Sequence, residues 1–411
     1  MRIVLWHGYL LGGTGSNVYT RALAREWSRA GHDVVVVCQE AHPEAYDVGE
    51  AKVVRADIGG LLPVFVVDRY EGLEVRLLQD FTRAERDRYV ELNAAAVRAQ
   101  LPADVVFTNH VLLGAPVGAA AGAPFAVKAH GSELEYSMRG NADLSEWGKV
   151  TLAEAQTVFV GSAHIRTVLE DVVGHVERVY EVPPGVDVDE FHPEERGEAL
   201  RRLLGEARND PPNPGNANER LPDEGNAERL AAFFATDEPT VLYYGKLLFN
   251  KGVHLLLDAL RELDARAVIV GFGDYRTQLE RAAPERTLFT GPLEHRHLVH
   301  LLPLADVSVV PSIFPEAFGM VAAEAAAAAV PPLVARHSGL AEIAAGLEAV
   351  YPEELRPLAS FESDGLAAQL AQLLALPVAT RRELGRAARR AAVERWSWSS
   401  VSKRLLSLHL R

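Results

Sequence analysis

Short apolar runs alternate with amphipathic segments along both halves of the chain, and this alternation limits the fold more than any other feature. RIVLW at residues 2–6 and DVVVVC at 33–38 are such runs in the first half. TVLYY at 240–244 and RAVIV at 266–270 repeat the pattern in the second half. Continuous apolar runs between helical patterns are typical of parallel strands that helices cover on both faces. We therefore predict an α/β protein with two Rossmann-like domains.

The stretch at residues 311–343 predicts a strand end, a loop, a helix, a second strand (PLVA) and a turn at Ser338-Gly339. Gly319 stands where the helix, expected from about Met320 to Ala329, begins. The unpaired backbone N–H groups at such a helix end, together with the positive end of the dipole, favour a bound diphosphate.

Two glutamates belong to the same stretch. Glu316 lies in the loop and Glu324 on the second turn of the helix, so both can face one ligand and contact different parts of it. Carboxylates accept hydrogen bonds from sugar hydroxyls, which makes a nucleotide sugar the natural occupant. The plainer interpretation is an Ala-rich core helix that carries two solvated glutamates.

Two lysines flank another loop of the second half. The apolar run at 240–244 ends at Gly245, Lys246 follows, and Lys251 precedes a helix. Two lysines on one loop can converge on a diphosphate and neutralise charge that grows on a leaving group. The alternative is a pair of ordinary surface lysines.

The first strand passes into a glycine-rich loop, where Gly12 and Gly13 can bring backbone N–H groups against an anion. A nicotinamide-dinucleotide fingerprint competes with this interpretation, because Gly13 and Gly15 imitate its first two glycines and Glu40 ends the second strand. However, the third glycine is missing and the loop is too long for the tight turn of that fingerprint.

Polar residues end two further strands of the first half: Asn109 and His110 end one, and Lys128, His130 and Glu133 follow the other. In a parallel sheet the carboxyl ends of the strands face the ligand crevice. Histidine is also the side chain most easily tuned near neutral pH. For His130 the alternative is a partly buried ring bonded to a neighbouring carbonyl.

These motifs together resemble the retaining glycosyltransferases of family 4. A pair of glutamates separated by seven residues, with Phe318-Gly319 between them, resembles the family signature. A Gly-Gly pair followed by Asn-Val-Tyr, here residues 12–13 and 17–19, is also characteristic of the family. The run PPGVD at 183–187, with Phe191 beyond it, resembles the segment that closes the first domain. The resemblance covers nearly the whole chain and implies the GT-B fold, in which two Rossmann-like domains face each other across a cleft.

The resemblance also implies the domain boundaries. We expect an N-terminal acceptor domain at residues 1–185, completed by a C-terminal helix at about 396–411, and a nucleotide-sugar domain at 186–395. Residues 205–228 are rich in Pro, Asn, Gly and acidic residues, which predicts a solvent-exposed, mobile insertion.

The implied reaction is transfer of a hexose from a UDP- or GDP-type sugar with retention of anomeric configuration, without a metal or another cofactor. Lys246 stands where the family usually has Arg, which keeps the charge but loses bidentate phosphate recognition. His130 would contact the 6-hydroxyl of the donor sugar and Glu324 the ribose. The catalytic candidates are His130, Glu316, Lys246 and Lys251. The donor-binding candidates are Gly12, Gly13, Gly245, Gly271, Gly273, Phe318, Gly319, Met320, Val321 and Glu324.

The acceptor is less constrained. Polar and aromatic candidates would suit a small soluble polyol, a sugar or a sugar acid, as well as a lipid head group; they are Tyr9, Asn109, His110, Glu133, Tyr136 and Arg139. A sugar-nucleotide epimerase of the same fold and a non-catalytic nucleotide-sugar binding protein are the competing functions. The former would turn over a nucleotide sugar without an acceptor, and the latter would bind it without turnover.

Two patterns could suggest a metal. Asp187-Val188-Asp189 forms a DxD triplet, but it belongs to the segment that closes the first domain, so we favour a structural role. His295, His297 and His300 would fall on different faces of a helix, which predicts solvated side chains.

Composition narrows the partners. The net charge of −14 argues against nucleic acid or an anionic membrane as the partner of a broad surface. A membrane-surface role for the basic helix RRELGRAARR is disfavoured because its arginines are not accompanied by aromatic residues. The chain shows neither a signal-peptide pattern nor an apolar run near twenty residues, so we expect a cytoplasmic protein. The single Cys38, inside an apolar run, is expected to be a core thiol.

Overall fold

The structure, a computed structural model, describes residues 1–66, 70, 72–263, 265–362 and 364–411. The chain divides into two compact units. The first unit comprises Met1–Pro184 and Trp398–Arg411, and the second comprises Gly185–Ser397. In both units the principal sheet is entirely parallel among the described residues, as the continuous apolar runs predict.

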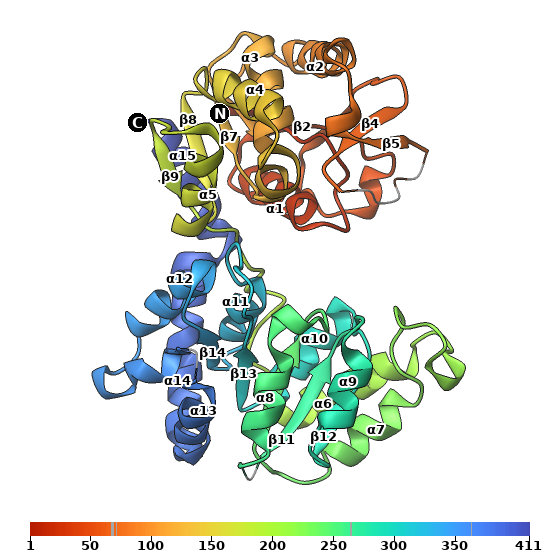
Figure 1. Ribbon diagram of the computed structural model, residues 1–411, viewed down its shortest axis with the longest axis vertical. Helices are drawn as coiled ribbons and strands as arrows, with labels where there is room; N and C mark the ends of the chain where they lie inside the picture. Colours follow the sequence, from red (N-terminus) through yellow and green to blue (C-terminus); the bar gives the residue numbers. More distant parts are fainter. Residues whose placement is uncertain (67–69, 71, 264, 363) are drawn as a thin grey trace. The chain divides into compact units, whose positions relative to one another are not determined.

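The described part of the first unit contains a seven-stranded sheet in the order β3-β2-β1-β6-β7-β8-β9 (Figure 1). Its strands are β1 (Arg2–Trp6), β2 (Asp33–Cys38), β3 (Lys52–Arg55), β6 (Val105–Asn109), β7 (Phe125–Lys128), β8 (Thr157–Val160) and β9 (Val179–Glu181). Its α-helices are α1 (Gly15–Arg29), α2 (Arg83–Arg98), α3 (Ala115–Ala121), α4 (Ala142–Leu152), α5 (Ala163–Val173) and α15 (Trp398–His409).

Strand β1 shows why its sequence is continuously apolar. Ile3 and Leu5 belong to a core that α1 and α15 cover, whereas Val4 and Trp6 belong to a second core on the other face, covered by α2, α3, α4 and α5. All four side chains are fully buried because successive residues of a strand point to opposite faces. Cys38 is buried in the first of these cores, which confirms its expected role as a core thiol.

Two further strand-like stretches of the sequence, LLPVFVVD at 61–68 and EVRLL at 74–78, do not join this sheet. They form β4 (Leu61–Val64) and β5 (Glu74–Leu77), which pair with each other in parallel. Residues 67–69 lie outside the described residues.

The second unit has, among its described residues, a six-stranded sheet in the order β12-β11-β10-β13-β14-β15. Its strands are β10 (Thr240–Tyr244), β11 (Arg266–Val270), β12 (Thr287–Phe289), β13 (Val307–Val310), β14 (Pro332–Ala335) and β15 (Ser360–Phe361). Its α-helices are α6 (Arg196–Arg208), α7 (Asn226–Phe233), α8 (Val253–Leu260), α9 (Arg276–Ala282), α10 (His295–Leu301), α11 (Met320–Ala327), α12 (Ser338–Glu348), α13 (Leu366–Ala375) and α14 (Val378–Ala391).

Two details of the second unit differ from expectation. Ser338-Gly339 does not form a free turn, because α12 begins there. The segment 205–228 is also more structured than its composition predicts. Its first residues complete α6, and Asn213 and Asp223 are buried through hydrogen bonds and ion pairs that a composition count does not reveal.

The last helix returns to the first unit. Figure 1 shows α15, in dark blue, beside the yellow elements of that unit. The indole N–H of Trp27 in α1 donates to the carbonyl of Ser402 at 3.1 Å, and Leu405 is buried in the core that Ile3 and Leu5 share. The helix thus completes one face of the first sheet.

Leu405→Ala is expected to lower the free energy of unfolding of the first unit by about 2–5 kcal/mol, because it leaves a cavity in a closed core. Hydrogen exchange of the β1 and β2 amides in urea measures this loss. The matched control is Leu410→Ala, at a side chain that is 54% exposed, and it should change stability by less than about 0.5 kcal/mol. Equal losses in the two variants would contradict the docking of α15.

Candidate active site

The strand order of the second unit locates a ligand crevice. From β10 the chain proceeds outward through β11 and β12, then returns to β13 on the other side of β10 and proceeds through β14 and β15. In such a sheet, ligands bind at the carboxyl ends of the strands where this direction reverses. The loops that follow β10 and β13, at residues 245–252 and 311–319, meet at that point.

The backbones of these two loops approach very closely. The N–H groups of Ile313 and Phe314 both donate to the carbonyl of Asn250, at 3.0 and 3.1 Å. Gly252 has a φ of 69°, and a Cβ there would lie 1.9 Å from the carbonyl oxygen of Pro311. Only glycine satisfies both the backbone conformation and the contact, so the sequence Asn250-Lys251-Gly252 fixes the position of Lys251.

Lys251 and Glu316 form an ion pair across the crevice. Lys251 Nζ lies 2.5 Å from Glu316 Oε1, and about a quarter of each side chain is exposed (26% and 23%). Two contacts from the start of α12 hold the backbone of Glu316. Its N–H donates to Ser338 Oγ at 2.8 Å, and its carbonyl accepts from the Gly339 N–H at 2.9 Å. The two predicted residues are therefore brought together at a position that solvent can reach.

The helix end next to this pair is also as predicted. Gly319 precedes α11 with a φ of 118°, and a Cβ there would lie 2.6 Å from Leu340 Cδ2. Phe318 is buried against Trp396, with 6.1 Å between the ring centroids, so it supports the loop from beneath. Met320 and Val321 form the first turn of α11 and are partly exposed.

Glu324 lies on the next turn of α11 in a different environment. The Tyr244 hydroxyl, at the end of β10, donates to Glu324 Oε2 at 3.0 Å. Burial raises the pKa of Glu324 to about 7, although that hydrogen bond and the nearby His295 favour the ionised form. His295 is itself held 2.5 Å from Glu190, and this hydrogen bond raises its pKa. Glu316 and Glu324 thus do not share one environment.

Glycines let the strand ends beside the crevice approach one another. Gly271 has a φ of 143°, and a Cβ there would lie 1.8 Å from the carbonyl oxygen of Gly245. A Cβ at Gly273 would lie 2.5 Å from the carbonyl oxygen of Leu247. The exposed Lys246 stands between these contacts, and its carbonyl accepts from the Tyr243 hydroxyl at 2.8 Å.

In the first unit, His130 belongs to a buried polar cluster. The Asn109 amide nitrogen donates to the Trp6 carbonyl at 3.1 Å, which leaves Asn109 Oδ1 to accept from His130 Nε2 at 2.7 Å. Glu133 accepts from the His130 backbone N–H at 2.9 Å and lies 3.1 Å from His110 Nδ1. Burial, with the neighbouring charges of His110 and Lys128, holds the pKa of His130 well below its usual value. Its imidazole is therefore neutral at pH 7.

A further histidine, which the motifs did not single out, connects this cluster to the glycine-rich loop. His7 Nε2 donates to Asn17 Oδ1 at 2.8 Å, and the Asn17 amide in turn donates to the Gly12 carbonyl. Burial lowers the pKa of His7 to about 3. Gly12 is partly exposed and Gly13 is exposed with a φ of 92°.

The acceptor candidates separate into two groups. The side chains of Tyr9, Asn109, His110 and Glu133 are buried, in or against the polar cluster of the first unit. Tyr136 is 62% exposed, and Arg139 is exposed in an ion pair with Glu135 at 2.7 Å. A position at or after the end of a strand in the sequence does not show which candidates have buried side chains and which have exposed ones.

Neither metal pattern forms a metal site. Asp187 Oδ1 accepts from the backbone N–H groups of Asp189 and Glu190, each at 3.1 Å, which agrees with a structural role. The expectation of solvated histidines is wrong for His297, which is fully buried 2.9 Å from Asp210. Across the described residues, no group of three or more His, Cys, Asp or Glu side chains could hold a metal ion.

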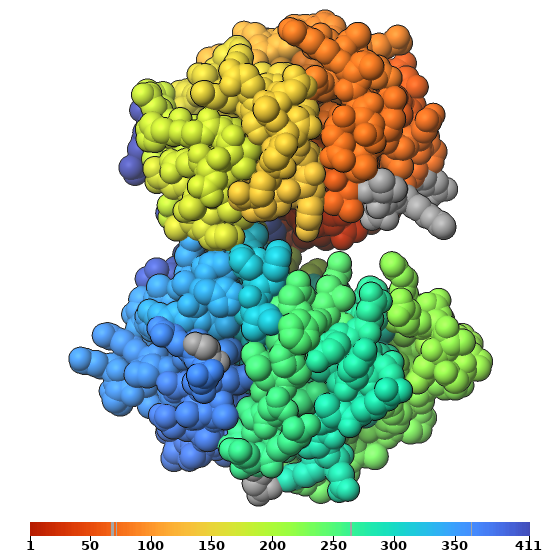
Figure 2. Space-filling model, in the orientation of Figure 1, coloured from red at the N-terminus to blue at the C-terminus, as the bar shows by residue number. Residues whose placement is uncertain are grey.

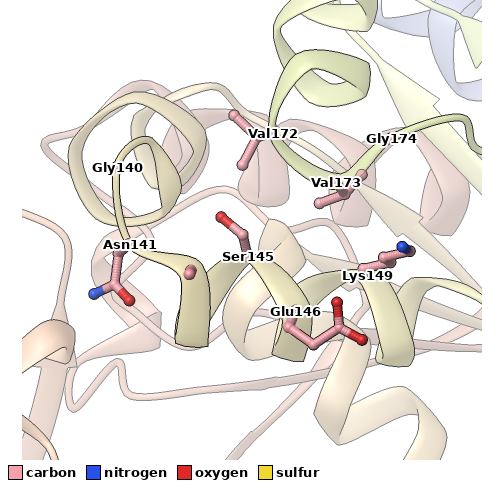
Figure 3. A pocket seen from close by; sticks show the side chains of 9 residues that line it. Gly140, Asn141, Ser145, Glu146, Lys149, Val172, Val173 and Gly174 are labelled. Carbon is pink, nitrogen blue, oxygen red and sulfur yellow. The ribbon is translucent and has the colours of Figure 1, made fainter.

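A cavity of about 580 Å³ lies between the start of α4 and the end of α5, and Figure 3 shows the side chains that line it. The residues that line it include Asn141, Ser145 and Glu146 of the first of these segments, and it contains none of the predicted site residues. The Asn141 side chain accepts from the Leu144 N–H at 3.2 Å and so caps α4.

The residues missed in the sequence are mostly partners from distant elements. Tyr244 and Ser338 hold the two glutamates, yet Tyr244 and Glu324 are 80 residues apart. One local signal was present, because Asn250 directly precedes the Lys251-Gly252 pair.

The two parallel-sheet units, with a helix N-terminus beside a lysine–glutamate ion pair at a strand-order reversal, have the architecture of the GT-B fold. The family description Glycosyltransferase Family 4 matches residues 13–190, and Glycosyl transferases group 1 matches residues 226–391. The chain belongs to these glycosyltransferases.

Relatives that align over nearly the whole chain are also named as glycosyltransferases. The D-inositol 3-phosphate glycosyltransferase of Xylanimonas cellulosilytica is 29% identical, and the alignment covers 96% of this chain and 91% of the relative. The MMP alpha-(1->4)-mannosyltransferase of Mycolicibacterium hassiacum is 27% identical, with coverage of 96% and 94%. The crystal structure of Anabaena HepE in complex with UDP has the same fold, with a TM-score of 0.66, 16% identity and 99% of each chain covered. Among the described residues, none of the helices has the length and apolar character needed to cross a membrane.

The raised pKa of Glu324 predicts a pH dependence. The folded protein retains the proton between pH values of about 4.5 and 7, so this group lowers stability as pH rises through that window and contributes no further change above it. Glu324→Gln cannot ionise and should gain stability relative to the wild type over the same window. Thermal unfolding at a series of pH values measures the difference.

The control for this prediction is Glu353→Gln, which removes an exposed carboxylate. A difference between wild type and Glu324→Gln that stays constant from pH 4.5 to 8 would show that Glu324 titrates in the folded protein as it does in the unfolded chain.

Proposed function

We propose that the protein transfers a hexose from a UDP- or GDP-type sugar to a hydroxyl of a small soluble polyol, sugar or sugar acid, with retention of anomeric configuration and without a metal. The observation that carries this proposal is the Lys251–Glu316 ion pair at the strand-order reversal, beside the start of α11. In this pair the ammonium group of Lys251 lies 2.5 Å from the carboxylate of Glu316, which can accept hydrogen bonds from sugar hydroxyls. The helix N-terminus beside the pair favours anions.

In the proposed complex, Lys251, Lys246 and the N–H groups after Gly319 stabilise the diphosphate. Glu316 exchanges its contact with Lys251 for hydroxyls of the donor sugar, and Glu324 contacts the ribose. The acceptor oxygen forms a bond to the anomeric carbon while the bond from that carbon to the diphosphate oxygen breaks. The acceptor proton goes to the departing diphosphate, on the same face of the sugar. Fixed cations stabilise the transition state most where negative charge develops, which in this reaction is on the departing diphosphate.

His130 has a proposed positioning role towards the donor sugar. Its neutral ring is fixed by Asn109 and its backbone by Glu133, so its Nδ1 can accept a hydrogen bond from a sugar hydroxyl, or its carbonyl dipole can face the sugar, without an added positive charge. The exposed Tyr136 and Arg139 are the proposed acceptor contacts. The relative named for D-inositol 3-phosphate supports a small polyhydroxy acceptor.

Lys251→Ala and Glu316→Gln are each expected to reduce kcat/KM for transfer by at least about 100-fold, as for other groups that stabilise developing charge or fix a reacting sugar. Both side chains are partly exposed, so circular dichroism should show folded variants. Lys403→Ala and Glu353→Gln, at exposed positions, are the controls for charge and should keep wild-type rates. Near-normal transfer by either site variant would refute the proposed donor site.

Transfer should continue unchanged in excess EDTA, because the paired lysines and the helix end take the place of a metal at the diphosphate. The rate with and without EDTA, followed by re-addition of Mg²⁺ or Mn²⁺, measures this. If EDTA stopped turnover and the metal restored it, the metal-free mechanism would be wrong. The anomeric configuration of the product, read by NMR, tests retention in the same assay.

A further inference from the structure

Residues 209–225 lie outside both matched family regions, which end at 190 and resume at 226. In the structure this segment folds against the carboxyl end of β12. Figure 2 shows its light green surface directly beside the green surface of the elements that follow it in the second unit. The segment therefore lies between the two matched regions, at an edge where parallel sheets bind ligands.

Asp223 anchors the segment to that edge. Its carboxylate is almost fully buried and accepts two hydrogen bonds from Arg276, at 2.8 and 2.5 Å. Its backbone N–H donates to the carbonyl of Thr290 at 2.9 Å. Gly291 leaves the space for this contact, because a Cβ there would lie 2.5 Å from Asp223 Oδ1. A bidentate Arg–carboxylate pair of this kind fixes orientation as well as position.

Asn213 gives the segment its shape. Its amide nitrogen donates to the carbonyls of Asn218 and Pro222, at 3.1 and 3.0 Å, and its Oδ1 accepts from the Asn218 N–H at 2.9 Å. The Asn218 side chain accepts from the N–H of Arg220 at 3.0 Å. The loop closed in this way presents Arg220 at its exposed tip.

Arg220 lies over the turn that ends β11. Its guanidinium carbon is 5.4 Å from the centre of the Phe272 ring, within the range of a cation–π contact. The carbonyl of Phe272 accepts from the Leu247 N–H at 2.8 Å, so this turn is joined to the loop that carries Lys246. Arg220 therefore stands one turn away from the proposed diphosphate site.

The residues on the two sides of the crevice indicate in which direction a bound nucleotide would extend from α11. On the β14 side the space is filled by the start of α12, where His337 contacts the Ser312 carbonyl at 2.7 Å and a Cβ at Gly339 would lie 2.5 Å from the Ala317 backbone. On the β11 side the strand ends carry glycines instead, and Glu324 is close enough to His295, after β12, for their charges to interact. A ligand that starts at α11 therefore extends towards β11 and β12.

We propose that residues 209–225 form one wall of the nucleoside site and that Arg220 recognises the base of the donor. This inference rests on the proposed function. The guanidinium has only N–H donors and packs over the Phe272 ring, so its free N–H groups select a base with a carbonyl acceptor, as in uracil and guanine. Adenine offers no carbonyl and is not selected.

Isothermal titration calorimetry of the full chain with UDP, GDP, ADP and pyrophosphate tests this. The wild type should bind UDP or GDP more tightly than ADP. Arg220→Ala should weaken the preferred nucleotide by about tenfold or more, the typical value of a bidentate contact to a base, and leave ADP and pyrophosphate unchanged. Arg220→Lys should lose nearly as much, because a lysine keeps the charge but not the planar pair of donors. Arg208→Ala, at an exposed arginine of the same charge on α6, should bind every probe as the wild type does.

Other outcomes overturn the inference. Equal binding of all probes by Arg220→Ala and the wild type would remove Arg220 from the base site. An equal loss for pyrophosphate, or full rescue by Arg220→Lys, would show a general charge effect and no base recognition. Lys251→Ala separates the two proposals. If it weakens pyrophosphate and every nucleotide, the donor site stands whatever Arg220 does; if it weakens none of them, the donor site fails and the base site with it.

Discussion

The close approach of two loop backbones, at Gly252 and Pro311, is the constraint on which the rest of the candidate site depends. Any side chain at Gly252 would overlap the Pro311 carbonyl, and the paired hydrogen bonds to Asn250 hold the loops in one register. As a result Lys251 and Glu316, which are 65 residues apart, meet at 2.5 Å. Because the backbone fixes both residues, a charged substrate that bound to the pair would lose little entropy in ordering them.

The two glutamates of the signature have different electrostatic surroundings because their partners differ. Glu316 faces a lysine and solvent, whereas Glu324 faces a tyrosine hydroxyl and the interior, where burial favours the protonated form. In the proposed complex this difference would let Glu324 donate or accept a hydrogen bond beside the nucleoside near neutral pH.

Local sequence predicted what depends on local backbone geometry. The strands, the glycines at their ends, Lys251 and the helix after Gly319 lie where the patterns placed them. It did not predict what depends on partners from remote elements. His297 is buried because Asp210, on the insertion, pairs with it, and the composition of residues 205–228 concealed the anchoring of Asp223 by Arg276. Strand-end position likewise could not show that Asn109 and His110 are enclosed by aromatic neighbours from other elements.

The second unit interrupts the first, since residues 185–397 lie between two segments of one core. The ends of the interrupting unit meet, because the Val186 N–H donates to the Trp396 carbonyl at 2.6 Å and Val186 pairs with Ser397. On a ribosome, α15 therefore emerges only after the whole second unit, and until then α1 covers the sheet face that contains Ile3 and Leu5 without its partner helix. The unit that is synthesised first is thus completed last, and the second unit can fold while the first still waits for its final helix.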